Sequence, residues 1–294
     1  MVFAAVCFAG FESCQSTKTS TATKKLKFDL EKGKGYDYEM IMNMDQEIMG
    51  QKIQLDMSTY YSMEVEADSA DTKTITTSID RFKMKGGTGG FVFEVDTDMP
   101  IQESTDSTDK ENPLKMVNKI FAAIRGQKFT MKVNAEGKVT DVRGFENMAQ
   151  TLMDSMDLPE DKKDEMQKQF DSQFNGDEIK GQMERFWYIF PNKEVKVGDS
   201  WEKNSVMGGK LPGKYNSTYK VKEIEGDMVT LEEKTKVESE EVKMKLSGDI
   251  TGTIVVDSRS GLVVSAKQDM KLTASAGGMS FDIKGKTQIK GKAR

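Results

Sequence analysis

The sequence contains no histidine, and its only two cysteines, Cys7 and Cys14, both lie near the N-terminus. Without histidine, the chain cannot form the Ser–His or Cys–His pairs that activate many nucleophiles, or the histidine ligands common in zinc sites. The position of the cysteines also excludes a disulfide within the body of the chain. We therefore expect a protein that is not an enzyme and that has no cofactor and no metal site.

The charge balance shows no excess that would favour a polyanionic partner. The 294 residues include 43 basic and 48 acidic side chains, a formal charge of -5. Two lysine-rich segments, residues 18–27 and 284–294, lack the interleaved aromatic side chains that stack on bases. We expect no nucleic-acid binding, and we interpret most of these lysines as solvated.

The N-terminus resembles an export signal that ends in a site of lipid attachment. Residues 1–11 are apolar but too short to span a bilayer, and a Ser/Thr/Lys tract follows at residues 15–25. Between them, Phe11-Glu12-Ser13-Cys14 is similar to a bacterial lipobox, in which the cysteine is acylated. We expect a signal peptide over 1–14, lipid on Cys14, a flexible tether over 15–27, and a lipid-anchored protein in the outer membrane or periplasm. A soluble exported protein and a cytosolic protein remain alternatives.

Alternation with period two dominates the rest of the chain and predicts β-strands. In the C-terminal third, Leu246, Ile250 and Ile254 share one face, whereas Lys245 and Asp249 lie on the other. One apolar and one polar face are typical of an antiparallel sheet that is covered on one side. Near Asp80–Arg81 the alternation changes phase, which predicts a β-bulge.

A block with helical periodicity interrupts the strands at about residues 112–189. Three apolar stripes repeat every three or four residues: Phe145, Met148, Leu152 and Met156; Met166, Phe170 and Phe174; and Ile179, Met183, Phe186 and Trp187. We therefore predict an α+β fold in one domain, residues 28–294. Its large curved antiparallel sheet would be a half-barrel or barrel-like, with the helical insert on its concave face.

Two hairpin turns in different parts of the chain resemble each other. Residues 133–139 and 256–263 both show a strand, a polar turn that ends in glycine, and a second strand. This similarity raises the hypothesis of two related halves, residues 30–142 and 195–290, which would pair at their edges to form one body.

Methionine is unusually common, with 21 residues. Its flexible, polarisable side chain suits surfaces that accept varied apolar ligands, but it also fills irregular cores. The candidate lining between sheet and helices consists of Met42, Met57, Met153, Met156, Met166, Phe170, Phe174, Met183, Phe186 and Trp187. For any one of these residues, simple core packing remains the alternative.

Two acidic features are weaker candidates. Glu232-Glu233 could indicate paired catalytic carboxylates, but adjacent residues on a strand face opposite ways. The segment 96–111 is acidic but lacks the spacing of a calcium loop, so we interpret it as a solvated loop.

The segment Phe190-Pro191-Asn192-Lys193-Glu194-Val195-Lys196-Val197-Gly198-Asp199-Ser200-Trp201 resembles one found in an uncharacterised bacterial lipoprotein family of Bacteroidota type. In layout that family is similar to the half-open β-barrel lipoproteins of the Lol and LppX type. The resemblance implies a curved sheet with helices in its hollow and a hydrophobic ligand between them. It implies no reaction.

Together these observations predict a non-catalytic envelope lipoprotein that binds or shields a lipid, an acyl chain or another apolar ligand. The alternative is a structural or interaction module with a filled core that docks an envelope protein. A carboxylate-based hydrolase is a third hypothesis, for which the sequence shows no convergent set of residues.

Overall fold

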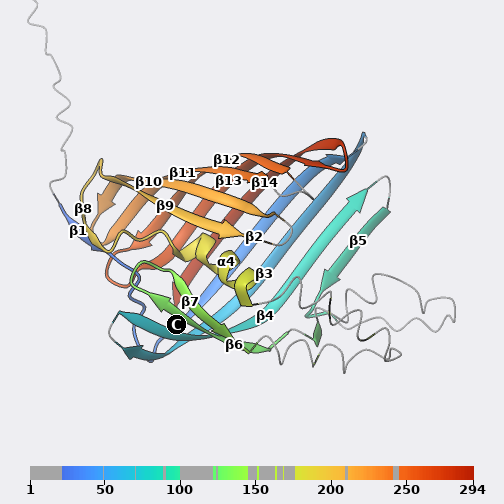
Figure 1. The fold of residues 1–294 in the computed structure, drawn as a ribbon. Helices are drawn as coiled ribbons and strands as arrows, with labels where there is room; N and C mark the ends of the chain where they lie inside the picture. Colours follow the sequence, from blue (N-terminus) through green and yellow to red (C-terminus); the bar gives the residue numbers. More distant parts are fainter. Residues whose placement is uncertain are drawn as a thin grey trace, which may run out of the picture.

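The computed structural model describes residues 22–48, 50–69, 71–88, 91–99, 122–123, 125–144, 151, 163, 168, 176–208, 211–240 and 245–294. Within these ranges, the protein is a twelve-stranded antiparallel sheet with one short helix (Figure 1). The helix is α4 (Gly176–Trp187), which confirms the third of the three helical stripes. The residues of the other two stripes lie outside the described residues.

The sheet contains two meanders. The first consists of β2 (Gly35–Ile48), β3 (Gln51–Ser69), β4 (Thr72–Thr88), β5 (Phe91–Asp96), β6 (Lys128–Asn134) and β7 (Val139–Arg143). The second consists of β9 (Ser200–Met207), β10 (Gly213–Glu225), β11 (Met228–Glu240), β12 (Lys245–Asp257), β13 (Leu262–Ala276) and β14 (Met279–Ala293). A separate two-stranded sheet pairs β1 (Lys24–Leu26) with β8 (Lys193–Val195), so residues 24–26 of the expected tether form a strand.

The first and last strands of the large sheet are neighbours. The strand order is β7-β6-β4-β3-β2-β14-β13-β12-β11-β10-β9, with β5 beside β4. In the central pairing of β2 with β14, Glu39 lies opposite Lys290 and accepts a hydrogen bond from its ammonium at 3.1 Å. The two meanders are thus joined into one continuous surface, with β7 and β9 as its outer strands.

The sheet does not close into a barrel, and the barrel-like alternative is therefore wrong. Strands β7 and β9 are not paired with each other, and α4 contacts both of them. The helix lies in the hollow of the sheet between these two strands (Figure 1). The approach to β9 is close at Gly181, where a Cβ would lie 3.3 Å from the carbonyl oxygen of Val206. We refer to this helix-filled gap between β7 and β9 as the seam.

One end of the sheet, which we call the base, is filled by the N-terminal segment. Leu26, Phe28 and Leu30 are completely buried there. The backbone N–H of Phe28 donates to Ala135 at 2.8 Å, and that of Asp29 donates to Ser260 at 3.0 Å. These two acceptors belong to the β6–β7 and β12–β13 turns, the pair whose sequences resemble each other. The two turns therefore hold adjacent residues of the same segment.

The other end of the sheet, which we call the rim, is formed by the opposite turns. The β2–β3, β4–β5, β9–β10, β11–β12 and β13–β14 connections all lie at this end, as the strand registers require. Figure 1 shows several of these hairpins at the right of the view. In the pairing of β3 with β4, the register shifts so that Asp80 is an extra residue, which is the bulge expected from the sequence.

Candidate functional site

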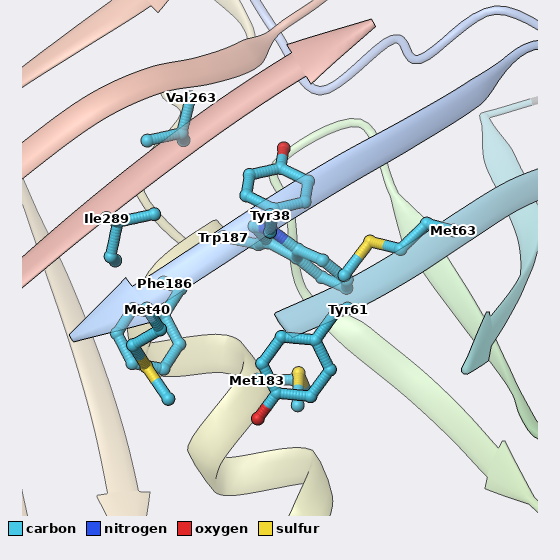
Figure 2. A pocket seen from close by; sticks show the side chains of 9 residues that line it. All are labelled: Tyr38, Met40, Tyr61, Met63, Met183, Phe186, Trp187, Val263 and Ile289. Atoms are coloured by element: carbon cyan, nitrogen blue, oxygen red, sulfur yellow. The ribbon is translucent and has the colours of Figure 1, made fainter. Parts of the chain in front are cut away.

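A small apolar cavity lies between α4 and the inner face of the sheet (Figure 2). Its volume is about 40 Å³, enough for one or two water-sized groups. Met183, Phe186 and Trp187 of α4 form one wall, and β2, β3, β13 and β14 form the other. The sheet contributes Tyr38, Met40, Tyr61, Met63, Val263 and Ile289.

Two tyrosines line this cavity, of which Tyr38 is buried and Tyr61 is half-buried. Burial raises the pKa of Tyr61 to about 12, and it raises the pKa of Tyr38 as well. Tyr38 lies opposite Gly291, where a Cβ would come within 2.7 Å of the tyrosine ring. The glycine therefore leaves the space in which the ring packs across β14. Both phenols stay neutral at physiological pH, so the cavity wall carries no charge from them.

A row of three methionines continues the inner face from the cavity towards the rim. Met42 on β2 lies directly opposite Met57 on β3, which in turn lies opposite Met84 on β4. They occupy the same face as Tyr38 and Met40, because side chains on a strand alternate. All three are half-buried, whereas Tyr36, Met63 and Ile75 nearer the base are fully buried. We call Met42, Met57 and Met84 the methionine row.

The next row towards the rim is also apolar. Met44 lies opposite Leu55, Leu55 lies opposite Gly86, and Gly86 lies opposite Phe93. A Cβ on Gly86 would lie 2.5 Å from the Phe93 ring, so the ring covers the glycine. Met44, Leu55 and Phe93 are half-buried like the methionine row. The rim half of β2, β3, β4 and β5 thus offers a continuous apolar strip on its inner side.

On the other meander, the inner face carries a buried ion pair. Arg185 of α4 lies 2.7 Å from Glu233 of β11, and the side chains are 9% and 0% exposed. Glu233 also accepts hydrogen bonds from Gln268 at 2.5 Å and from Thr235 at 2.8 Å. The Arg185 guanidinium lies 5.8 Å from the centre of the Tyr215 ring. These contacts compensate both charges where water is excluded.

Gly252 makes the packing around Glu233 possible. It lies between Glu233 and Gln268 in the register of β11, β12 and β13. A Cβ at this position would come 2.9 Å from Cγ of Gln268 and 3.3 Å from Oε2 of Glu233. Without a side chain on β12, the glutamine can reach across that strand to the carboxylate.

A second group of charges spans the seam. Lys203 of β9 is paired with Glu136 in the β6–β7 turn, and its ammonium lies 4.3 Å from the centre of the Tyr188 ring. Lys138 approaches the same ring at 5.7 Å. Tyr188, which follows α4, therefore has a lysine from each side of the seam beside it. Cation–π contacts and the ion pair hold the two edges to the end of the helix.

Of the expected lining residues, the structure brings five to the inner face. Met183, Phe186 and Trp187 line the cavity, while Met42 and Met57 lie in the methionine row. Met153, Met156, Met166, Phe170 and Phe174, and the expected lipidation site Cys14, lie outside the described residues.

Sequence reasoning missed several residues of this face. Tyr38, Met40, Tyr61 and Met63 share the alternation of Met42 and Met57, so the periodic signal for them was present. Arg185 and Glu233 were missed because an ion pair between residues 48 positions apart leaves no local pattern. Position 233 does follow the inward alternation of its neighbours 231, 235 and 237.

The two weaker acidic candidates have structural explanations. Glu232 faces outward, 3.7 Å from Lys222, while Glu233 faces inward, so the two carboxylates do not converge. Asp96 accepts hydrogen bonds from Nε and Nη2 of Arg81, at 2.9 and 2.7 Å, and this bidentate contact holds the pKa of Asp96 below its usual value. The expectation of a solvated loop is thus wrong for Asp96, because its carboxylate is nearly buried in that pair.

Neither a metal site nor a membrane-crossing helix is found in the part of the chain that the structure describes. No three acidic, cysteine or histidine side chains there could jointly hold a metal ion. Among the same residues, no helix combines the length and apolar character that a bilayer span requires.

Comparison with solved structures gives only weak likenesses. The chain is similar to the outer membrane protein Omp33 of Acinetobacter baumannii, with 7% identity, 91% of this chain and 99% of that chain covered, and a TM-score of 0.17. For Pseudomonas aeruginosa OpdK with vanillate, the identity is 9%, 88% of this chain and 67% of that chain are covered, and the TM-score is 0.15. For P. aeruginosa OccK5 (OpdH), the identity is 8%, 90% of this chain and 99% of that chain are covered, and the TM-score is 0.18. Scores this low carry no argument about fold or function.

The sequence itself matches one protein family. None of the curated proteins compared with the chain matches it significantly. The family described as "Family of unknown function (DUF6263)" matches residues 70–263, which run from the start of β4 to the start of β13 and make up well over half of the chain. This protein is therefore a member of the DUF6263 family.

Proposed function

We propose that this protein is a non-catalytic binding protein of the bacterial envelope that holds an acyl chain or a similar apolar ligand against its inner face. The observation that carries this proposal is the methionine row, Met42, Met57 and Met84. These side chains form a continuous apolar strip with Met44, Leu55 and Phe93, and they are half-buried rather than fully packed. Flexible thioethers in such a strip can adapt to chains of different shape.

The small cavity limits where a ligand can lie. At about 40 Å³ it is far below the roughly 300–1,000 Å³ of typical ligand pockets. A bound chain would therefore lie along the methionine row, with at most its end directed towards Met40 and Tyr61. The base itself is filled by Phe28 and its neighbours, so the rim is the side from which we expect the ligand to enter.

The charges of the inner face favour an uncharged ligand portion. Arg185 is already neutralised by Glu233, and the phenols of Tyr38 and Tyr61 remain protonated. A free carboxylate or phosphate placed beside the methionine row would lose its hydration without a described partner. We expect any charged head group to stay at the rim, where water is accessible.

The cellular location of the protein is part of this proposal. The apolar segment 1–11 followed by Cys14 supports export and lipid anchoring in the outer membrane or periplasm. Mass spectrometry of the N-terminus of the mature protein tests this directly. A lipid-modified Cys14 at the N-terminus is expected, whereas an unmodified Cys14 or a retained Met1 would contradict the anchor.

Ligand binding is tested in two steps. Native mass spectrometry of protein purified from the envelope is expected to show a co-purified lipid or fatty acid. A lipophilic fluorescent dye is then expected to bind the delipidated protein and to be displaced by free acyl chains. Absence of both a co-purified lipid and dye uptake would refute the binding function.

A second candidate is a structural or interaction module with a filled core that docks an envelope protein. The observation that favours it is the small volume of the cavity between α4 and the sheet. In this case, chemical cross-linking in intact cells would give one reproducible protein partner, and the delipidated protein would take up no dye.

A further inference from the structure

Large apolar side chains that are strongly exposed are concentrated at one end of the described structure. Val206, Val92 and Met279 are 71%, 63% and 53% exposed. Of the large apolar residues with comparable exposure in the described ranges, Met99 at 62% is the exception to this location. Single exposed apolar residues are common on protein surfaces, so their shared position is the informative feature.

The strand registers place these three residues at the rim. Val206 is the penultimate residue of β9, Val92 is the second residue of β5, and Met279 begins β14. Each strand ends or starts at a rim turn, and the chain of pairings from β9 to β5 runs through β14 and β2. The three side chains therefore come from three different hairpins around the same open end of the sheet.

The base turns have the opposite character. The β10–β11 turn carries Asp227, which pairs with Lys24 at 2.7 Å and with Arg259 of the β12–β13 turn at 3.2 Å. By contrast, two rim turns are flanked by apolar residues, as in Gly277-Gly278-Met279 and Met207-Gly208. The exposed large apolar residues Val92, Val206 and Met279 thus lie at the rim and not at the base, although both ends are built from the same strands.

The charges that flank the rim turns are balanced. Exposed Lys52, Lys214 and Lys245 are accompanied by exposed Glu47, Glu238 and Asp282 at the same end. Among these six described residues the charges cancel, so they do not select anionic phosphates. If it binds a partner, the apolar residues must supply the attraction.

We propose that the rim is a contact surface for lipid, and that the apolar hairpin tips carrying Val92, Val206 and Met279 insert into the outer layer of a membrane or lipid aggregate. A fluid surface suits isolated apolar residues on separate hairpins, because it deforms around each one. A protein partner would instead need one continuous complementary patch of adequate area. Glycines beside the tips, such as Gly208 and Gly278, allow the tips to adjust as they insert.

This inference goes beyond the proposed function and does not require it. A rim that contacts lipid would bring the methionine row next to a source of acyl chains, because the row lies on the inner face of the same end. Surface contact and chain binding nevertheless use different residues, so each can fail without the other.

The experiment is flotation of the full chain with vesicles of neutral phosphatidylcholine. Cys14→Ser is used as the parent to remove the proposed lipid anchor, and every variant shares its N-terminus. The double variant Val206→Asp/Met279→Asp is expected to reduce the vesicle-bound fraction on the order of tenfold or more, because each change replaces inserted apolar surface by a charge. Met99→Asp is the matched control, with similar exposure away from the rim, and is expected to bind like the parent.

Further measurements distinguish apolar insertion from electrostatic attraction and from binding of an apolar ligand. Neutral and anionic vesicles, at low and high salt, are expected to bind the parent equally, since apolar insertion is not screened. Unchanged binding by the double variant, an equal loss with Met99→Asp, or a strict need for anionic lipid would each overturn the proposal. Dye uptake without vesicles, measured on the same proteins, reports the proposed ligand function: the double variant should retain it. If rim contact fails while dye uptake persists, only the lipid-contact inference is refuted.

Discussion

Arg185 and Glu233 form an ion pair of 2.7 Å in which neither side chain has appreciable contact with water. The arginine lies on α4 and the glutamate on β11, so this contact links the helix in the seam to the middle of the second meander. The three lining residues of the helix that the sequence predicted, Met183, Phe186 and Trp187, face the first meander and β13–β14. The helix is thus held from both sides of the hollow.

Removing one member of this pair should strongly destabilise the fold. Arg185→Met leaves the Glu233 carboxylate buried without its counter-charge, and we expect a loss of about 3–5 kcal/mol in the free energy of unfolding. Denaturant titration followed by far-UV circular dichroism measures this loss. The double variant Arg185→Met/Glu233→Leu should recover much of the loss, because no charge is then left unpaired. Equal losses in the single and double variants would contradict this account.

Gly137 should be far less replaceable than another glycine with the same backbone conformation. Gly137 and Gly33 have φ values of 82° and 79°, so alanine incurs a similar backbone strain of about 1–2 kcal/mol at either position. At Gly137, however, a Cβ would lie 1.6 Å from the carbonyl oxygen of Trp187, whereas Gly33 has no atom within 4 Å. Gly137→Ala should therefore cost at least about 2 kcal/mol more than Gly33→Ala in the same unfolding assay. A difference near zero would show that the helix end is not fixed against this turn.

Glu184 on α4 should make stability depend on pH. Burial raises the pKa of its carboxyl above the ordinary value of 4.5, although Lys180 and Lys138 oppose the shift. The folded state therefore holds this proton more tightly than the unfolded state, and the stability gained at low pH is lost as pH rises through the folded-state pKa. We expect Glu184→Gln to be more stable than the parent at pH 7 and equal to it near pH 4. Unfolding curves at both values test this, and a variant that is less stable at pH 7 would contradict it.

Met57 lies at the centre of the methionine row, so it is the most direct test of the proposed ligand site. Met57→Gln should weaken the binding of a lipophilic dye by about tenfold, because it places an amide in the apolar strip. Ser58→Gln introduces the same side chain one residue along, on the outer face of β3, and should bind the dye like the parent. Similar affinity of both variants would place the dye elsewhere. Unfolding curves of both proteins verify that the fold is retained.

Much of the sheet could be predicted because its residues carry a local period. Tyr38, Met40 and Met42 alternate with Asp37 and Asn43, which assigns β2 an inner and an outer face. The phase change near Asp80 indicated the bulge that the β3–β4 register shows. Alternation reports which face of a strand is covered, and for these elements it was sufficient.

The open seam and the buried ion pair could not be predicted in the same way. The apolar residues Val139 and Val142 indicate that one side of β7 is covered, but they do not show whether another strand follows on both sides. Whether β9 or a helix occupies that position depends on contacts of residues such as Gly181 and Tyr188, which are set by the tertiary arrangement. The pairing of Arg185 with Glu233 could not be predicted either, because it too depends on the tertiary arrangement.

The pairing of β2 with β14 has a consequence for how the chain is made. Residues near the start of the folded body, such as Glu39, meet residues near its end, such as Lys290, in the middle of the sheet. During synthesis, the edge of β2 that pairs with β14 has no partner strand until more than two hundred further residues have been added to the chain. The two meanders can therefore pair only after β14 has been synthesised. Until then, β2 presents an unpaired strand edge, which is a site for aggregation with other chains.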